Sequence, residues 1–314
     1  MVKVIVTGGD GMMGQTIKKL TNDSITHHYK FINRKILDLT HRNRVLNYFK
    51  YYSSKGYTHI IHLAANVGGL YKNMESNIDM FSDNIKINEN ILEACYKYNF
   101  KRGIFILSSC IFPCNPSKFP MNESMIHESP PHNSNEGYSY AKRMLELQCR
   151  QYNKLGCQFI CLTPVNLYGP YDNFNLKNSH MIPGLMHRFF LTKQKFDKFV
   201  AYGTGNPLRQ FLYSYDFGEI ILQILHNSNV TDGNIICCND KEYSIKEIVN
   251  ILASVMTIKN SDIIWDTTKS DGCMKKTVSN TKLKSIISCE FTELKDGLNK
   301  TFRWFYQNYY KIRK

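Results

Sequence analysis

Hydrophobic residues in the first half of the chain fall into short runs separated by longer polar stretches. The runs occupy residues 3–7, 29–32, 59–63, 103–107 and 158–162. The stretches near 15–20, 41–51, 75–98 and 138–154 carry apolar residues at the spacing of amphipathic helices. Near-continuous apolar strands that alternate with helices indicate a parallel sheet covered on both faces. The pattern therefore predicts a doubly wound α/β fold.

Three glycines join the first predicted strand to the first helix: Gly8, Gly11 and Gly14. Small residues at this spacing let the backbone approach a pyrophosphate, and the N-terminus of the following helix favours its negative charge. A purely structural tight turn is the alternative. Because a strand precedes the glycines and a helix follows them, we favour a dinucleotide-binding sheet of the Rossmann type.

The second half of the chain is organised differently. Beyond about residue 165 the alternation is looser, with turn signals at 202–207 and a terminal helix near 292–310. We interpret residues 1–165 as the Rossmann domain. Residues 166–314 then form a smaller α/β substrate lobe that partly interleaves with the sheet, so that the boundary is discontinuous.

The end of the second strand bears on which dinucleotide is bound. An acidic residue there usually holds the ribose 2′-hydroxyl of NAD, whereas the 2′-phosphate of NADP requires cations. Arg34 and Lys35 favour NADP(H), with plain solvated surface as the alternative. Asp38 either caps the following helix or meets the adenine edge. Asp10 lies in the glycine loop where a cation would help, which weakens the preference for NADP slightly.

Tyr138 and Lys142 are spaced to lie on one face of a helix, one turn apart. A lysine ammonium beside a phenol stabilises the phenolate, so we expect the pKa of Tyr138 to fall towards neutrality and the phenol to donate a proton to a carbonyl. Ser108 ends the fourth predicted strand and is placed to hydrogen-bond the same carbonyl. Ser108, Tyr138 and Lys142 together predict a reductase triad.

Composition argues against several other classes of protein. The 314-residue chain has a formal charge of +14, but its basic residues are scattered and no nucleic-acid motif accompanies them. No apolar stretch is long enough for a membrane span. The ten cysteines lack the paired spacing of a zinc site, so no metal is expected. With no secretion signal at the N-terminus, we expect a cytoplasmic enzyme with mostly reduced thiols.

Longer motifs indicate a family. The chain resembles the GDP-L-fucose synthases, which belong to the extended short-chain dehydrogenases/reductases. The likeness covers nearly the whole chain and rests on VTGGDGMMG, HLAANVGGLYKN, SSCIFP, MIHESPPHNSNEGYSYAKRM, YGPYDNFN, HMIPGL, GTGNPLRQF and DTTKSDG. It implies an NADPH-dependent enzyme that converts GDP-4-keto-6-deoxy-D-mannose to GDP-L-fucose by 3,5-epimerisation and 4-keto reduction.

The resemblance also assigns an epimerisation pair. Cys110 is implied as the base and His180 as the acid, one on each side of the sugar. A thiol with an ordinary pKa near 8.5 and an imidazole near 6.5 both suit proton exchange with a C–H that a ketone has acidified. The alternatives are a buried structural thiol or a redox partner of Cys114, and a histidine that only satisfies backbone groups or touches the nicotinamide.

Further contacts follow from the family likeness. The cofactor is expected against the glycine loop, the ends of the strands, Lys142 and His180, a set that adds Met12, Met13, Leu39, Ala64, Ala65, Pro164, Val165, Asn166 and Leu167 to the residues above. The substrate is expected to contact Arg188, Tyr202, Arg209 and Asp271. Surface ion pairs are the alternative for the two arginines.

Two residues depart from the family pattern. Val165 replaces a threonine near the nicotinamide, and Tyr202 replaces a tryptophan. Both changes bear on affinity more than on activity. The family also implies a homodimer formed by the helices near 75–98 and 138–154. Rival hypotheses are a nucleotide-sugar 4-ketoreductase or epimerase with one activity only, a cofactor-binding scaffold without turnover, and a basic nucleic-acid binder.

Overall fold

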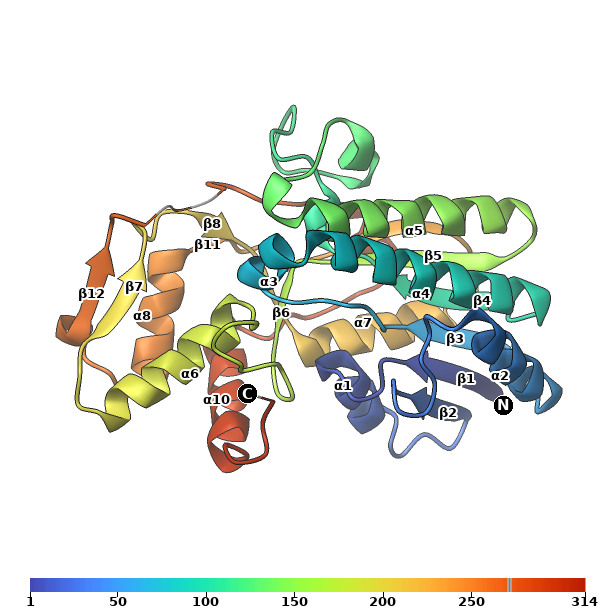
Figure 1. Ribbon diagram of the computed structural model, residues 1–314, viewed down its shortest axis with the longest axis horizontal. Helices are drawn as coiled ribbons and strands as arrows, with labels where there is room; N and C mark the ends of the chain where they lie inside the picture. The colour runs from blue at the N-terminus through green and yellow to red at the C-terminus, as the bar shows by residue number, and fades with distance from the viewer. Residues whose placement is uncertain (270, 272, 314) are drawn as a thin grey trace.

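The computed structural model describes residues 1–269, 271 and 273–313. A six-stranded sheet forms its largest layer, in the order β10-β5-β4-β3-β1-β2, with every pairing parallel (Figure 1). Its strands are β1 (Val2–Thr7), β2 (His27–Ile32), β3 (His59–His62), β4 (Arg102–Ile106), β5 (Gln158–Pro164) and β10 (Gly233–Cys237). The predicted α/β fold is confirmed, and β10 is a sixth strand that the apolar pattern did not predict.

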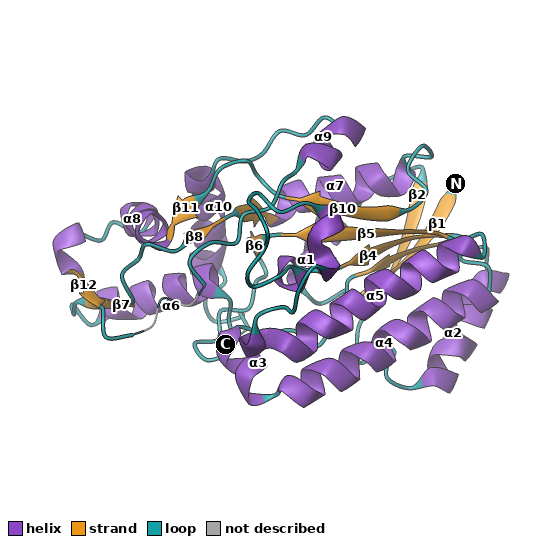
Figure 2. Ribbon diagram, turned by 90° about the horizontal axis from the view of Figure 1, so that it is seen from above, coloured by secondary structure: helices purple, strands orange, loops and turns teal. Residues whose placement is uncertain are grey.

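Helices cover both faces of this sheet, as a doubly wound fold requires. Figure 2 shows one layer of helices below the strands and another above them. The first layer contains α2 (Arg42–Ser54), α4 (Asn77–Lys97) and α5 (Glu136–Lys154). The second contains α1 (Met12–Leu20), which packs against α7 (Ser214–His226), and α9 (Thr281–Ile286), which lies against β10.

The long helix predicted near 75–98 is confirmed as α4, and a short helix that the sequence pattern did not predict precedes it. A short helix, α3 (Leu70–Glu75), ends at Ser76, whose φ of −127° and ψ of 37° are not helical, and α4 starts at the next residue. The break lets α3 turn towards the C-terminal lobe while α4 continues along the sheet. The predicted helix near 75–98 is therefore correct, and only α3 was missed.

The C-terminal lobe is built from small sheets and three longer helices. Its strands are β6 (Asn166–Tyr168), β7 (Phe199–Tyr202), β8 (Leu208–Arg209), β9 (Phe211–Tyr213), β11 (Tyr243–Ser244) and β12 (Ile263–Asp266). Its helices are α6 (Met181–Gln194), α8 (Ile245–Val255) and α10 (Leu294–Gln307). After residue 165 the chain returns to the main sheet for α7 and β10. The division at residue 165 therefore stays a proposal in which these two elements belong to the first domain.

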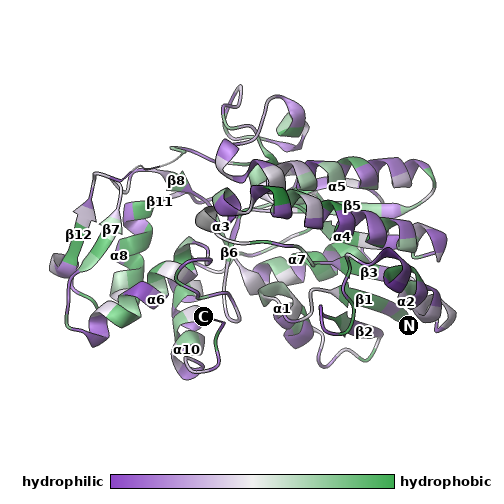
Figure 3. Ribbon diagram, viewed as in Figure 1, coloured by the Kyte–Doolittle hydropathy of each residue, from purple (hydrophilic) through white to green (hydrophobic). Residues whose placement is uncertain are grey.

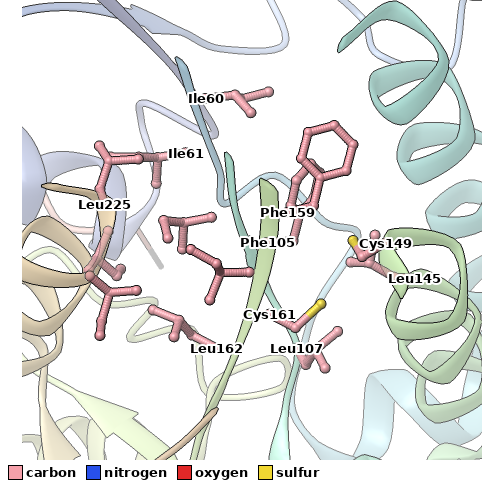
Figure 4. Close-up of a cluster of buried hydrophobic side chains, with 14 of the residues drawn as sticks. Ile60, Ile61, Phe105, Leu107, Leu145, Cys149, Phe159, Cys161, Leu162 and Leu225 are labelled. Carbon is pink, nitrogen blue, oxygen red and sulfur yellow. The ribbon is translucent and has the colours of Figure 1, made fainter. Parts of the chain in front are cut away.

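Each lobe has its own apolar core. The larger cluster joins the main sheet to its helices, and the smaller one joins α6, α8 and α10 to the small strands. Figure 3 shows the apolar colour concentrated on the central strands and on α7 and α8. In Figure 4, Leu225 of α7 lies on one side of the strands and Leu145 and Cys149 of α5 on the other. Among the described residues, no helix is both long and apolar enough to cross a membrane.

Candidate functional site

The predicted site residues collect at the carboxyl ends of the parallel strands. Gly8 follows β1, Ala64 and Ala65 follow β3, Ser108 follows β4, and Pro164 ends β5. Because all these strands run in the same direction, their ends and the loops after them share one edge of the sheet. In open α/β sheets, ligands bind in the crevice outside this edge.

The glycine loop has the geometry that a pyrophosphate site requires. Gly8 has a φ of +71°, which favours glycine, and its carbonyl accepts a hydrogen bond from Gly11 N at 3.0 Å. A Cβ on Gly14 would collide with the carbonyl oxygen of Gly8 and lie 2.7 Å from the Cα of Gly9. The helix can therefore start this close to the strand only if position 14 carries no side chain. No side chain caps the N-terminus of the helix at Gly11. Met12 and Met13 begin α1 directly beyond.

The loop after β2 holds the predicted specificity residues. Arg34 is largely exposed and lies 3.4 Å from a carboxylate oxygen of Asp38, so its guanidinium is available to a ligand. The other Asp38 oxygen accepts from the backbone N and hydroxyl of Thr40, at 3.0 and 2.8 Å, and these bonds hold the pKa of Asp38 below its ordinary value. Asp10 is engaged by the side-chain amide of Asn33. Asp38 therefore stabilises the turn before α2 but does not cap that helix, whose N-cap is His41 without a side-chain hydrogen bond, so the capping prediction is wrong and the contact with the adenine edge stays a prediction.

Hydrogen bonds from buried asparagines of α4 hold the next two loops. The side chain of Asn90 donates to the carbonyl of Leu39 at 2.8 Å. Asn84 accepts from the backbone N of Asn66 and donates to its carbonyl, at 3.0 and 2.9 Å. These bonds fix the backbone at the predicted cofactor contact Leu39, and at Asn66, two residues after the predicted contact Ala64.

The three members of the predicted triad converge from two elements. Tyr138 and Lys142 lie on α5, and the ammonium is 5.7 Å from the centre of the phenol ring. Lys142 is 2% exposed and donates to the carbonyl of Ile106, the last residue of β4, at 2.6 Å. Ser108 lies two residues further along and caps the short 3₁₀ helix Ser109–Ile111. The strand therefore anchors the lysine beside the serine.

Burial dominates the electrostatics of this cluster. It raises the pKa of Tyr138 above its ordinary value, with the nearby Cys110 adding to the rise. It lowers the pKa of Lys142 to about 8. The expected fall in the pKa of Tyr138 is therefore wrong for this structure, because desolvation of the phenolate outweighs the attraction of the lysine. A protonated phenol is still the form that donates a proton to a carbonyl.

Cys110 lies among these polar groups and is only partly buried. Its backbone N donates to the Ser108 hydroxyl at 3.4 Å, and its charge affects the pKa of both Tyr138 and Lys142. Cys110 and Cys114 are both free thiols here. Cys110 also packs against the main apolar cluster, so its chemical role stays a prediction.

His180 comes from the other lobe, where it is the residue before α6. Its ring is accessible to solvent, yet protein surrounds it on most sides, and this environment lowers the pKa of the imidazole. The segment before it is tied to the first lobe, since Gly69 N donates to the carbonyl of Asn178 at 3.0 Å. The proposed base and acid thus belong to different lobes.

The nicotinamide-side residues follow β5. Val165 is buried and its backbone N bonds the carbonyl of Cys237 in β10, at 3.2 Å. Asn166 donates to the carbonyl of Gln210 at 2.9 Å and Leu167 continues in β6. The chain here is positioned by backbone pairing with both neighbouring segments.

The predicted substrate residues form two groups in the C-terminal lobe. The guanidinium of Arg188 lies over the ring of Tyr202, 4.8 Å from its centre. Both carboxylate oxygens of Asp271 accept from Thr204, at 2.7 Å each. Asp271 therefore holds the turn after Tyr202, and its contact with a nucleotide stays a prediction; Ser270 and Gly272 of the same motif lie outside the described residues.

Arg209 is a partly buried cation, and desolvation lowers the pKa of its guanidinium. Within the described part of the chain, neither Arg188 nor Arg209 has an ion-pair partner. The surface ion pair considered as their alternative is therefore not what the structure shows.

Reasoning from the sequence missed several residues that shape the site. Thr7, His62 and Asn88 form a hydrogen-bonded chain under the loop after β3, and Gly69 lies against the segment before His180. The sequence signal for Thr7, His62 and Gly69 was their position at a strand end or in a glycine-rich motif, whereas Asn88, in the middle of α4, had no such signal. One hollow, lined by Thr40 and residues 41–44, adjoins Asp38, whereas another, beside Gln210 and Lys275, contains none of the predicted site residues.

Comparison with known proteins agrees with this geometry. Residues 4–238 match the NAD dependent epimerase/dehydratase family, and the chain belongs to that family. It is 40% identical to the GDP-L-fucose synthase of Dictyostelium discoideum, over 99% of this chain and 97% of that protein. It is 37% identical to the probable GDP-L-fucose synthase of Drosophila melanogaster over the full length of both.

A solved structure is similar as well. The crystal structure of a GDP-L-fucose synthetase from Naegleria fowleri bound to NADP superposes with a TM-score of 0.92 at 36% identity, covering 100% of this chain and 95% of that one. This similarity extends across both lobes.

Proposed function

We propose that this protein is an NADPH-dependent GDP-L-fucose synthase. It converts GDP-4-keto-6-deoxy-D-mannose to GDP-L-fucose by inverting C3 and C5 and then reducing the C4 ketone. The carrying observation is the cluster at the end of β4, where Cys110 lies with Ser108, Tyr138 and Lys142 in one partly buried group. A reductase needs only the last three, so the thiol supports the additional epimerase activity.

The residues present fit an NADP cofactor. The side-chain-free cradle formed by Gly8, Gly11 and Gly14 leaves the N-terminus of α1 open to a pyrophosphate. Arg34 has no strong partner, so it can reach a 2′-phosphate. The relative from Naegleria fowleri was solved with NADP bound. Bound NADPH would supply the hydride that is added to C4.

The epimerisation follows from the acidity that the ketone confers on neighbouring C–H bonds. Cys110 removes a proton from C3 or C5, and the electron pair moves onto O4 to give an enolate. Ser108 and Tyr138 donate hydrogen bonds to O4 and stabilise the enolate. His180, on the opposite side of the sugar, returns a proton to the other face of the carbon. Each inversion thus transfers one proton from carbon to thiolate and one from imidazolium to carbon.

The reduction uses the same carbonyl site. Tyr138 donates its proton to O4 as C4 accepts hydride, and the buried ammonium of Lys142 stabilises the phenolate that results. The last carbonyl of β4 anchors Lys142, so the ammonium stays in place while the phenol changes charge. Arg188 and Arg209 would bind the diphosphate, because both present guanidinium groups without carboxylate partners.

The first test is to incubate the purified protein with GDP-4-keto-6-deoxy-D-mannose in heavy water, with and without NADPH. We expect deuterium at C3 and C5 without cofactor, and GDP-L-fucose with oxidation of NADPH when cofactor is added. NMR follows the sugar, and near-ultraviolet absorbance follows the cofactor. Oxidation of NADPH without exchange would instead identify a simple ketoreductase and return Cys110 to a packing role.

We further propose a homodimer formed through α4 and α5. Apolar side chains stay exposed on the outer face of both helices: Ile78 and Phe81 on α4, and Met144 and Leu147 on α5. A second copy would cover this surface as a four-helix interface. Light scattering should give twice the mass of the chain, and Phe81→Lys together with Leu147→Lys should give a monomer.

We also propose a cytoplasmic location, because all ten cysteines are free thiols.

A further inference from the structure

Two adjacent glycines follow β3, and they differ in what surrounds them. A Cβ on Gly68 would lie 2.5 Å from the Cδ of Lys72, the middle of a flexible side chain. A Cβ on Gly69 would instead collide with the carbonyl oxygen of Ser179 and lie 3.0 Å from its carbonyl carbon. Ser179 directly precedes His180, the proposed acid.

Conformation does not explain the glycine at position 69. Its φ of −67° and ψ of −179° are extended values that any residue adopts. Space explains it: the backbone of this loop meets the backbone of the segment before α6 with no room for a methyl group between them. Gly69 N also donates to the carbonyl of Asn178 at 3.0 Å, which ties the two lobes together at this contact.

Neither side of the contact can retreat freely. On the first lobe, the buried side chain of Asn73 donates to the carbonyls of Gly68 and Gly69, at 2.8 and 3.0 Å. On the second, the side-chain oxygen of Asn175 accepts from the backbone of Lys177 and Asn178, at 2.9 and 3.0 Å.

The second segment has further anchors. Ser179 N bonds the carbonyl of Asn175 at 3.0 Å, and Gly184 N bonds the carbonyl of His180, also at 3.0 Å. A displacement of the Ser179 carbonyl therefore moves the peptide plane that carries His180.

We propose that Gly69 is a positioning residue for His180. It lets the loop after β3 close onto the chain one residue before the imidazole, and so sets the spacing between the acid of the C-terminal lobe and Cys110 of the first lobe. This inference rests on the proposed function, since it assigns a geometric requirement to the epimerisation. A misplacement of about 1 Å at a reacting group can cost on the order of 100-fold in rate.

The test separates exchange from inversion. With His180 displaced, Cys110 still removes a proton and returns deuterium from solvent to the same face. Gly69→Ala should therefore retain deuterium uptake at C3 and C5 within about threefold, while inversion of these carbons falls by about 100-fold. Gly68→Ala is the matched control, because its Cβ would meet only side-chain atoms of Lys72 and no atom of the segment before His180, so inversion should be retained.

Two further measurements exclude general damage. The affinity for NADP, measured by calorimetry, should be similar in the two glycine variants, and both should unfold in one cooperative thermal transition. Asn175→Ala removes the acceptors that stiffen the second segment without adding any atom, so it should show the same selective loss of inversion, to a smaller extent. This second variant carries the test if Gly69→Ala does not fold.

The outcomes are distinguishable. Unchanged inversion in Gly69→Ala, or a parallel loss of uptake, inversion and NADP binding, overturns the inference; so does unchanged inversion in Asn175→Ala if that variant carries the test. Absence of both uptake and inversion in the unchanged protein refutes the proposed function itself. A loss of inversion alone in Gly69→Ala, with Gly68→Ala unaffected, supports the positioning role.

Discussion

His62 should make the stability of this protein sensitive to acid. The ring is 1% exposed at the end of β3, and its Nδ1 lies 2.9 Å from the Thr7 hydroxyl. That hydroxyl already accepts from the backbone N of Leu63 and of Ala64, both at 3.1 Å, so its single proton is donated to Nδ1. Nε2 consequently carries the ring proton and faces the Asn88 side-chain oxygen at 3.3 Å.

A second proton on His62 has no acceptor in this arrangement. Burial, with a smaller contribution from the charge of Lys142, lowers the pKa of the imidazole from 6.5 to about 3. The unfolded chain therefore binds a proton below pH 6.5 that the folded state does not bind until about pH 3. Stability must fall as the pH is lowered through this window, by about 1.4 kcal/mol for each pH unit, or about 2 kcal/mol at pH 5.

The perturbation is His62→Gln, measured by urea unfolding at pH 7 and pH 5. The substitution itself lowers stability at both values, so the informative quantity is the change between them. We expect that change to be about 2 kcal/mol smaller in the variant than in the unchanged protein. Ile61→Val, a neighbouring core substitution without a titrating group, should preserve the full change. An equal pH dependence in His62→Gln and the unchanged protein would refute the assignment.

Three other predictions follow from buried groups of the site and its neighbourhood. Lys142, with a pKa lowered to about 8, should give NADPH-dependent reduction an alkaline limb near pH 8 in kcat/KM, and Lys142→Arg should move that limb upward. Burial raises the pKa of Asp172 to about 7, and one of its oxygens has no partner, so the folded state loses stability as pH rises from 3.8 through 7. Asp172→Asn should therefore raise the free energy of unfolding at pH 8 by about 1–3 kcal/mol, and an equal or lower value would contradict this. Gly14→Ala should weaken NADP binding at least about tenfold in calorimetry, whereas Gly11→Ala, whose Cβ would lie 3.2 Å from the Gly8 oxygen, should weaken it less.

Local patterns predicted the elements whose geometry depends on neighbours in sequence. Tyr138 and Lys142 lie one helical turn apart because of the helical repeat, and Ser108 follows a strand that its own apolar residues define. The glycine loop was likewise recognisable from the strand before it and the helix after it. These features need only short-range geometry, so they are readable before any fold is known.

Long-range contacts decided the remainder. The strand β10 extends the main sheet by pairing with β5, from which it is distant in sequence. The break at Ser76 separates α3 from α4. The direction of the pKa shift of Tyr138 depends on how deeply the phenol is buried. The spacing of Tyr138 and Lys142 in the sequence does not reveal this burial.

The sequence by itself thus determined the sheet type, the glycine loop and the helical spacing of Tyr138 and Lys142 in the predicted triad, since each is encoded within a few residues. The tertiary structure decided which groups surround the triad and how the two lobes meet. The contact of Gly69 with Ser179 joins positions that are distant in sequence. Neither segment has a sequence pattern that predicts this close approach of the two backbones. The pKa shift of Tyr138 and the contact between Gly69 and Ser179 both depend on packing between segments that are distant in sequence, so they can be read only from the folded structure.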